Sequence, residues 1–480
     1  MHIVDMIYFW ARTTPQWPAV IRPEGIVTYR ALAQGIEAAA KHFSLVIKDR
    51  SKPVTVAVGG EPKMLIASLA LLSAKFSIMV VHAPDIPFIS ASDSHTIVRG
   101  HDDEALNDRT NIVFEENWLR IGAGGTRFEA PFRPSRARDA DVFFFTSGTT
   151  GRPKRAIRTG QAWTQRMVFR VSSAFGGAER ALLLAGLDSS MGFSGAYEAL
   201  YAGKTICFAP QGQPALWLAN TYDIDQIIAS PQQALALAEI QERVTRYPLT
   251  ALRTIRLGGS IISPAGLDRI KNYLCRNVIL TYSSTEAGIV ALAPHDMIAH
   301  IPNAVGFLVP GAEVEIVDEK DNVLPAGAEG LVRLRTTEFL LNLGIDDPNV
   351  WFYPGDVGWL TGDGVLCIIR RKDDVINRGG VKLSIGDFED FLRSRPGVKD
   401  AGVSVVMGSA GFEQAWIGVV LDPAADIGML RQSIEGNTNF GTNIDRIFAV
   451  DAIPRGGLGK IQREELKKLL LSIDAHSGAQ

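Results

Sequence analysis

The residues best suited to chemistry lie in the segment FFFTSGTTGRPKR, residues 143–155. Three phenylalanines run directly into glycines and hydroxyl side chains, and a proline and a lysine follow. The glycines let backbone amides approach an anion closely, the hydroxyl groups add short donors, and the lysine adds a positive charge. This composition predicts a loop that wraps the phosphates of a nucleotide. The residues concerned are Thr146, Ser147, Gly148, Thr149, Thr150, Gly151 and Lys154.

The spacing of this loop differs from that of the two common nucleotide motifs. In the pattern GxxxxGK[ST] the glycines are further apart than Gly148 and Gly151, and Lys154 is followed by Arg155 instead of serine or threonine. The segment GAGGTR fails the pattern GxGxxG at Arg127. A Ser/Thr/Gly cluster is usually only a loop. Its position between an apolar strand and Pro-Lys favours the anion-binding interpretation.

Four further segments complete a recognisable order. They are YSSTEAG (282–288), YPGDVGWL (353–360), RRKDDVINRGGVKLS (370–384) and PRGGLGKIQREEL (454–466). Together with the glycine loop, they resemble the motifs of the adenylate-forming enzymes, which include acyl- and aryl-CoA ligases, stand-alone adenylation domains and firefly-type luciferases. The motifs occur in family order and cover nearly the whole chain. The hinge-like segment resembles that of the CoA ligases more than that of the amino-acid enzymes.

The resemblance implies a two-step reaction. A carboxylate attacks the α-phosphate of ATP and pyrophosphate leaves, and a thiol, most often that of coenzyme A, then attacks the acyl-AMP. Because one anion approaches another, the site must supply positive charge and fixed donors. The resemblance assigns Lys460 to the carboxylate and α-phosphate, Thr285 to the α-phosphate, and Glu286 to Mg²⁺, which prefers hard oxygen ligands. Taken alone, Lys460 reads as an exposed lysine and Glu286 as a surface carboxylate.

The resemblance also implies the contacts to the nucleoside. Asp356 accepts from both ribose hydroxyls through charge-assisted hydrogen bonds, and Arg371 also contacts the ribose. Gly259 and Ser260, in the segment LGGSI, lie along adenine, and Tyr282 belongs to the same nucleotide-binding set. The plain alternative for Asp356 is a turn aspartate after glycine.

A domain boundary is expected within the segment 370–384. In the family, a small domain rotates after adenylation and exchanges the catalytic lysine for a thiol path. Asp373 falls on the hinge position, and Gly379 and Gly380 fall on the segment that lines the thiol path. We therefore predict an N-terminal domain at 1–372 that binds ATP and acid, and a C-terminal domain at 373–480 that supplies the lysine. The plain alternative for NRGG is a turn.

Departures from the family pattern leave the substrate open. Ser283 replaces the usual glycine after the tyrosine, which predicts a reshaped and modest or polar acid pocket. Asp188 is an alternative candidate for the carboxylate with which amino-acid enzymes hold an ammonium group, although the spacing to Gly203 fits CoA ligases better. A separate carrier protein is an alternative acceptor, and a non-catalytic nucleotide-sensing relative is a third reading. The sequence does not identify the acid or the oligomeric state.

Composition fits an ordinary globular protein. The chain has 480 residues, 46% hydrophobic and 21% charged, and a net charge of −3 from 49 basic and 52 acidic residues. Nothing in this balance indicates a nucleic-acid or membrane surface. The three cysteines, Cys207, Cys275 and Cys367, show no pairing pattern, which predicts core thiols and a reduced, cytoplasmic setting. None of the eight histidines lies in a motif.

The elements that position these motifs predict an α/β fold. Apolar runs alternate with helical segments in three stretches, at 53–81, 180–210 and 249–284, which indicates parallel sheets covered by helices. After about residue 305, short alternating strands and turn signals predict a small antiparallel β section. From Asp373 onward the pattern predicts a separate α+β unit, with a helix capped by Ser384 and a terminal helix near Leu466 and Leu470.

Overall fold

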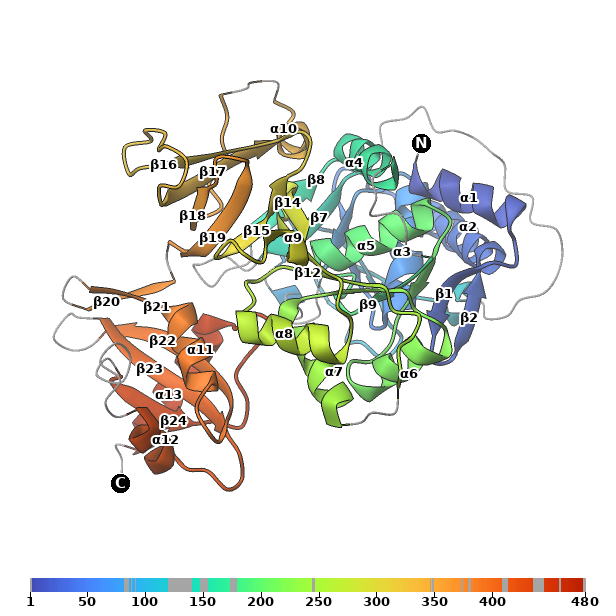
Figure 1. Cartoon of the computed structure of the whole chain (residues 1–480). Helices are drawn as coiled ribbons and strands as arrows, with labels where there is room; N and C mark the ends of the chain where they lie inside the picture. Colours follow the sequence, from blue (N-terminus) through green and yellow to red (C-terminus); the bar gives the residue numbers. More distant parts are fainter. Residues whose placement is uncertain are drawn as a thin grey trace. The chain divides into compact units, whose positions relative to one another are not determined.

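The computed structural model divides the chain into two compact units (Figure 1). Unit 1 comprises Met1–Val314 and Leu334–Phe352, and unit 2 comprises Glu315–Arg333 and Tyr353–Gln480. The boundary predicted at 372/373 lies inside unit 2 and remains a prediction. The structure describes every residue except 1, 82–85, 88, 91, 120–139, 147–153, 173–178, 244–246, 346, 348, 373, 379–380, 408–412, 435–443, 457–458 and 478–480. At Thr146 and Lys154 it describes the backbone alone.

A six-stranded sheet forms one layer of unit 1. Its order is β6 (Thr110–Val113), β5 (Thr96–Arg99), β3 (Val54–Ala57), β4 (Ile78–Val80), β7 (Val142–Thr146), β8 (Lys154–Arg158). The pairings among the first five strands are parallel, and only β7 and β8 pair antiparallel. All four residues of β3 are buried, as expected for a central parallel strand covered on both faces. The predicted strand–helix–strand unit at 53–81 is confirmed.

The second run of strands in unit 1 is longer. Its order is β15 (Ala304–Leu308), β14 (Gly288–Pro294), β13 (Val278–Ser284), β12 (Thr254–Gly258), β11 (Gln226–Ala229), β9 (Arg180–Leu183), β10 (Thr205–Cys207), β1 (Pro18–Arg22), β2 (Gly25–Thr28). The pairings from β13 through β1 are parallel, and those of β14, β15 and β2 are antiparallel. The other two predicted strand–helix–strand units are therefore confirmed.

Helices fill and cover these layers. They are α1 (Ile3–Thr13), α2 (Tyr29–Val46), α3 (Glu61–Ser73), α4 (Gly160–Ser172), α5 (Ser190–Tyr201), α6 (Gln213–Thr221), α7 (Pro231–Arg243), α8 (Pro264–Tyr273), α9 (His295–Ile298) and α10 (Thr337–Leu343), with a short 3-10 turn at Glu116–Trp118. Helix α5 contacts both sheets. The ring centroid of its Phe193 lies 5.5 Å from that of Phe144 on β7. Its Gly195 packs against β9 so closely that a Cβ there would lie 3.2 Å from the Leu183 side chain.

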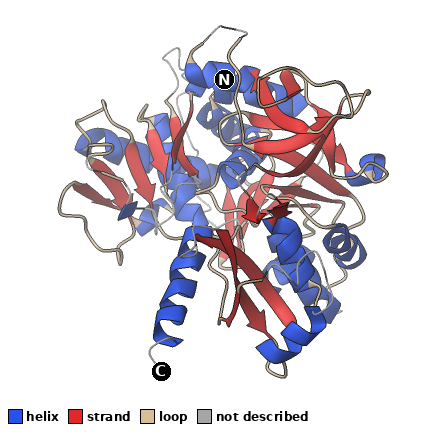
Figure 2. Cartoon of the chain, turned by 90° about the vertical axis from the view of Figure 1, so that its left-hand side faces the viewer, coloured by secondary structure: helices blue, strands red, loops and turns tan. Residues whose placement is uncertain are grey.

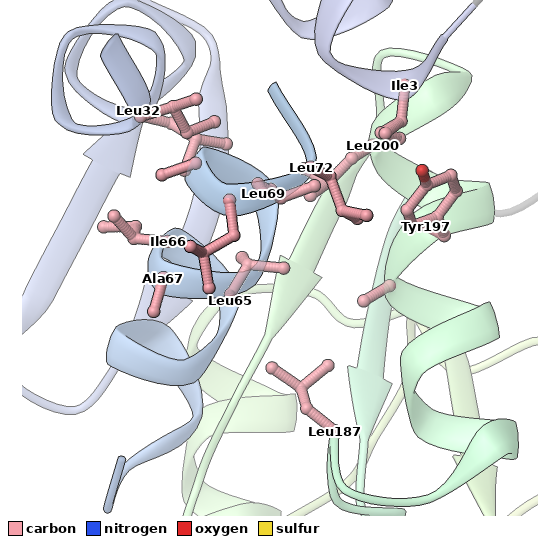
Figure 3. Packing of buried hydrophobic residues seen from close by; sticks show 14 of the residues in the cluster. Ile3, Leu32, Leu65, Ile66, Ala67, Leu69, Leu72, Leu187, Tyr197 and Leu200 are labelled. Carbon is pink, nitrogen blue, oxygen red and sulfur yellow. The ribbon is translucent and has the colours of Figure 1, made fainter. Parts of the chain in front are cut away.

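One hydrophobic cluster joins the two sheets through these helices. Figure 3 shows part of it, with the apolar side chains of α3 and α5 in the same cluster. Helix α3 is buried nearly all round, from Leu65 to Leu72, as expected for a helix enclosed by other elements. Because both helices are enclosed, they fix the sheets whose strand ends carry the motif residues.

Glu61, the first residue of α3, is half-buried and has an unusual charge environment. Burial raises the pKa of its carboxyl group to about 7; Leu187 N–H, 3.0 Å from Oε2, opposes this, and the nearby Asp188 carboxylate adds to it. A folded-state pKa above the unfolded value means that the ionised carboxyl destabilises the fold above pH 7. The free energy of unfolding therefore rises as the pH falls from about 7 towards 4.5, the pKa of the Glu61 carboxyl group in the unfolded chain.

We expect Glu61→Gln to stabilise the protein at pH 8, by on the order of 2 kcal/mol, and to have little effect near pH 4.5. The amide oxygen can still accept from Leu187 N–H. Denaturant midpoints of both proteins between pH 4.5 and 8 measure this difference. A difference in denaturant midpoint between the two proteins that does not change with pH would contradict the raised pKa of Glu61.

Unit 2 begins with an antiparallel β section, as predicted. Its strands are β16 (Ala312–Val317), β17 (Gly330–Thr336), β18 (Asp356–Leu360) and β19 (Val365–Arg371), and β16 and β17 begin or end in unit 1. The hairpin β18–β19 turns at residues 361–364, where Gly364 has a φ of +84°. The turn signal TGDG is thereby confirmed.

The rest of unit 2 is the predicted α+β portion. It contains β20 (Val375–Arg378), β21 (Val381–Ser384), α11 (Ile385–Arg393), β22 (Val398–Met407), β23 (Glu413–Leu421), α12 (Ile427–Ile434), β24 (Arg446–Ala449) and α13 (Arg463–Ser477). Ser384 caps α11 by accepting from Asp387 N–H, as its position before an apolar stripe predicts. Figure 2 shows α13, the helix that ends at the C mark.

The two faces of the sheet β22–β23–β24 pack against different helices. Val403 and Ile417 share a core with α11 and α12, whereas Leu466 and Leu470 of α13 pack on the opposite face. A Cβ at Gly402 would lie 2.8 Å from Leu466, so glycine there lets α13 approach the strand closely. The two-sided packing fixes where α13 begins, and Lys460 lies three residues before that point.

The predicted fold class is confirmed as α/β with a small second unit. All three cysteines are free, and burial raises the pKa of the Cys207 and Cys367 thiols, the latter to about 11, so both are unreactive core thiols. Among the described residues, no helix combines the length and apolar character needed to cross a membrane.

Candidate active site

The segment YSSTEAG forms the hairpin between β13 and β14. Ser284 Oγ accepts from Ala287 N–H at 3.0 Å, Asn342 Nδ2 donates to Glu286 O at 3.2 Å, and Thr336 Oγ1 donates to Ala287 O at 2.7 Å. These bonds fix the backbone of the turn and leave the side chains of Thr285 and Glu286 half-exposed at its tip. A fixed donor and a fixed carboxylate at a strand end suit phosphate and Mg²⁺ binding.

Glycine is required at the end of this turn. Gly288 has a φ of +74°, and a Cβ there would lie 2.0 Å from Oε2 of Glu338. The final glycine of the motif therefore follows from local geometry as well as from the resemblance.

The segment LGGSI follows the neighbouring parallel strand. Gly258 ends β12 and pairs with Thr281 of β13, so Gly259 and Ser260 lie at the same sheet edge as the turn. Both are exposed, and Gly259 has a φ of +91°. Ligands of parallel α/β sheets bind at the carboxyl ends of the strands. The structure thus brings together Gly259, Ser260 and the segment from Tyr282 to Glu286.

The glycine loop joins β7 to β8. Thr146 pairs with Lys154 at the end of that antiparallel ladder, so the loop begins and ends at adjacent positions. Ser147, Gly148, Thr149, Thr150 and Gly151 lie outside the described residues. Their phosphate-binding role stays a prediction.

Unit 2 places Asp356 opposite Arg371. The two residues pair across the β18–β19 ladder, and Arg371 Nε lies 3.1 Å from Asp356 Oδ1. Arg371 also donates to Pro354 O. Gly355, with a φ of +81°, makes the bend that turns Asp356 into the strand. The predicted ribose pair is therefore adjacent, with Asp356 buried and Arg371 side chain 41% exposed and accessible to a ligand.

Lys460 lies close enough to this pair to respond to its charges. Partial desolvation lowers the pKa of the Lys460 ammonium group, and Arg371 acts in the same direction, whereas Asp374 and Asp356 oppose it. The side chain nevertheless keeps an exposed surface, so solvent screens these charges. Lys460, Asp356 and Arg371, which are distant in sequence, thus form one charge cluster in unit 2.

Arg455 positions the segment that carries Lys460. Its guanidinium group forms a bidentate pair with Asp400, at 2.7 and 3.0 Å, and donates to Gly459 O at 2.7 Å. Gly456 N–H donates to Lys460 O at 2.9 Å, which closes the turn. Sequence reasoning missed this pair, because nothing in the sequence links residues 55 positions apart.

Arg463 ties the start of α13 to two other elements of unit 2. It pairs with Glu389 of α11 at 2.6 Å and with Asp374 at 3.2 Å, and it donates to Val403 O at 2.9 Å. Asp373, the predicted hinge, and Gly379 and Gly380, the predicted thiol path, lie outside the described residues. Their roles remain predictions.

The donor set at the turn fits Mg²⁺. In the described part of the chain, no cluster of three or more His, Cys, Asp or Glu side chains could hold a metal ion. Glu286 would therefore contribute a single carboxylate, with phosphate oxygens and water as the other ligands. Mg²⁺ in nucleotide sites commonly uses one or two carboxylates in this way.

Comparison with known proteins agrees with this arrangement. The family model described as AMP-binding enzyme matches residues 8–340. The 4-coumarate–CoA ligase 1 of Glycine max is 28% identical over 49% of this chain and 86% of its own length. The 4-chlorobenzoate–CoA ligase of Arthrobacter sp. is 26% identical over 75% of this chain and 71% of its own length.

A solved structure shares the fold over almost the whole chain. The O-succinylbenzoate coenzyme A synthetase of Bacillus subtilis in complex with AMP superposes with a TM-score of 0.78, at 20% identity, over 96% of this chain and 98% of that one. The same synthetase with ATP and magnesium ion gives a TM-score of 0.75. The chain belongs to the AMP-binding enzyme family, as its motifs predict. The predicted class, an AMP-forming ligase of the acyl- or aryl-CoA synthetase type, is confirmed by these relatives.

Proposed function

We propose that the chain activates a carboxylic acid with ATP and transfers the acyl group to the thiol of coenzyme A. The observation that carries this proposal is the charge cluster of unit 2, in which the adjacent Asp356–Arg371 pair lies within electrostatic range of Lys460. A ribose-binding carboxylate next to a mobile cation is what an adenylating site requires. The buried, unreactive thiols are in keeping with a cytoplasmic setting.

The first step forms a bond between a carboxylate oxygen and the α-phosphorus and breaks the bond to the β-phosphate oxygen. Lys460 offsets the negative charge of both reactants, and Thr285 donates a hydrogen bond to an α-phosphate oxygen. Asp356 holds the ribose diol, so that the nucleotide is positioned before the acid attacks. Glu286 would hold Mg²⁺, which would neutralise negative charge on the leaving pyrophosphate.

In the second step, the thiol sulfur attacks the acyl carbonyl carbon and AMP leaves with the electrons of the broken C–O bond. Gly379 and Gly380 are proposed to line the path of the thiol, because a residue without a Cβ leaves room for a narrow pantetheine arm. Asp373 is proposed as the hinge that lets residues 373–480 change position between the steps.

An acid panel tests this function. The full chain with Mg²⁺ and ATP is assayed for AMP release, with and without coenzyme A, and the products are identified by mass. We expect AMP release that requires both an acid and coenzyme A, with the matching thioester as product. Acylation of an added carrier protein but not of coenzyme A would assign the chain to carrier loading instead.

A non-catalytic, nucleotide-sensing relative is the other outcome. It predicts ATP binding without pyrophosphate release for any acid. The paired Asp356 and Arg371 and the cationic Lys460 favour catalysis over this reading.

A further inference from the structure

Unit 1 contains a cavity of about 170 Å³ beside the turn that carries Thr285 and Glu286. Residues of α4, α5, β12, β14, α10 and the segment 309–311 line it, together with Ala287, the residue that follows Glu286 in the turn. Figure 1 shows these elements in the part of unit 1 around β12 and β14. A cavity of about 150 Å³ can hold benzene, so this one suits the body of a small organic acid.

Most of the cavity wall is apolar. Side chains of Ala162, Ile289, Leu292, Val309 and Leu341 form that part of the lining. Binding pockets typically combine such a wall with a few polar groups that fix the orientation of the ligand. Ser283, from which a modest or polar acid pocket was predicted, does not line the cavity.

Four of the polar side chains that line the cavity are charged and buried. Arg166 Nη1 pairs with both carboxylate oxygens of Glu338, at 2.9 and 3.0 Å, and Arg256 Nη1 lies 3.2 Å from Oε2 of Glu198. All four side chains line the cavity, and none is more than 14% exposed. Arg158, which is 1% exposed, also pairs with Glu338 from the adjoining strand β8.

These charges do not balance. Three guanidinium groups face two carboxylates, which leaves one positive charge in excess among the described side chains of the cluster. Burial lowers the pKa of Arg166 to about 9, with Arg256 adding to the effect, and burial lowers the pKa of Arg256 to about 10. Both shifts have the sign expected for cations that are not fully compensated.

Unused hydrogen-bond donors accompany the excess charge. Of the groups that the structure describes, none accepts from Nε of Arg166, whose side chain is 7% exposed. A further anion, Glu286, acts on Arg158. In the proposed reaction Glu286 holds Mg²⁺, so it does not compensate the cluster. A buried cation without a partner is strongly destabilising, and an anionic ligand removes that cost.

We propose that the acid activated here is a small dicarboxylic acid with an apolar body, whose second carboxylate binds at the Arg166–Arg256 side of this cavity. This proposal rests on the proposed function, because it assigns the cavity to the substrate of the adenylation step. The first carboxylate then faces Thr285 and the α-phosphate, and the body of the acid lies along Ile289 and Leu292. The second carboxylate makes the numbers of buried positive and negative charges equal.

Matched acid pairs test the substrate class. Adipate is compared with hexanoate, and isophthalate with benzoate, in acid-dependent pyrophosphate release by the full chain. A site built for a charged group rejects an analogue that lacks this group. In at least one of the two pairs, we therefore expect kcat/KM for the diacid to exceed kcat/KM for the matching monoacid by at least about 100-fold. Equal or better activation of the monocarboxylic acids overturns the inference while leaving the proposed function intact.

Two variants test the charge count. Arg166→Gln makes the cluster neutral, and we expect it to reduce the preference for the diacid, measured as the ratio of the kcat/KM values of diacid and monoacid, at least about 10-fold. The double variant Arg256→Gln/Glu198→Gln removes one charge of each sign, keeps the excess, and should retain a preference for the diacid. If the double variant loses the preference for the diacid and Arg166→Gln keeps it, the excess positive charge does not bind the second carboxylate.

Thermal melting separates this inference from the proposed function. We expect the active diacid at millimolar concentration to raise the melting temperature of the parent protein and of the double variant, but not that of Arg166→Gln. Such a shift without turnover of any acid supports the binding site and refutes the catalytic function. Turnover of monoacids with no diacid shift supports the function and refutes the site.

Discussion

Replacing Lys460 with alanine is expected to lower the rate of acyl-adenylate formation by about 100- to 1,000-fold. The lysine ammonium group acts where two negatively charged reactants meet, so its loss weakens the transition state more than the bound ground state. The dissociation constant for ATP should change by less than about fivefold, because the Asp356–Arg371 pair remains. Single-turnover formation of acyl-AMP and equilibrium binding of ATP measure the two quantities separately.

Lys468→Ala provides a matched control for this variant. Lys468 lies on the exposed side of α13 and pairs with Glu465, one helical turn away, in a contact of the kind that contributes little. We expect its adenylation rate to equal that of the parent. If Lys460→Ala adenylates as fast as Lys468→Ala, the role of Lys460 in the first step is wrong.

Replacing Asp356 with asparagine is expected to raise KM for ATP by about 100-fold with a smaller change in kcat. The carboxylate is proposed to make two charge-assisted hydrogen bonds to the ribose, each worth about 1.5–3 kcal/mol. An asparagine side chain loses the charge and can accept through one oxygen only. Asp363→Asn, at the exposed tip of the β18–β19 turn, controls for the loss of a carboxylate elsewhere in the same hairpin.

The ribose contact can be distinguished from a structural role of Asp356 with 2′-deoxy-ATP. In the parent protein the missing hydroxyl should weaken binding, whereas in Asp356→Asn the two nucleotides should bind more nearly alike. An unchanged discrimination in the variant would show that Asp356 only supports Arg371 and the hairpin.

The parts of the fold that local pattern determines were predicted from the sequence. Continuous apolar runs such as that of β3 mark central parallel strands, and Ser384 marks the start of α11 because its side chain caps the helix. The β18–β19 hairpin followed from its turn residues. In each case the signal lies within a few residues of the element that it specifies.

Features that depend on contacts between distant segments could not be predicted from the sequence. No local pattern marks Arg158 and Arg166 as buried, yet both side chains are buried against Glu338. No sequence pattern indicates that Arg455 forms an ion pair with Asp400. The grouping of the β18–β19 hairpin with the C-terminal residues also depends on packing, which no local pattern encodes.

The candidate site was predicted in part for the same reason. Family motifs gave the positions of Thr285, Glu286, Asp356, Arg371 and Lys460. The structure adds what fixes some of them, such as the three hydrogen bonds at the turn of Glu286. The cavity that we propose as the acid site was not predictable, because its lining comes from six segments spread between residues 162 and 341.

Exchange of labelled pyrophosphate into ATP, measured with the purified full chain, tests adenylation most directly, since it reports reversible acyl-AMP formation without any thiol acceptor. We expect exchange that starts on addition of a suitable acid, requires Mg²⁺, and falls at least about 100-fold in Lys460→Ala. Binding of ATP with no exchange for any acid in a broad panel of mono- and dicarboxylates would contradict adenylation by this chain.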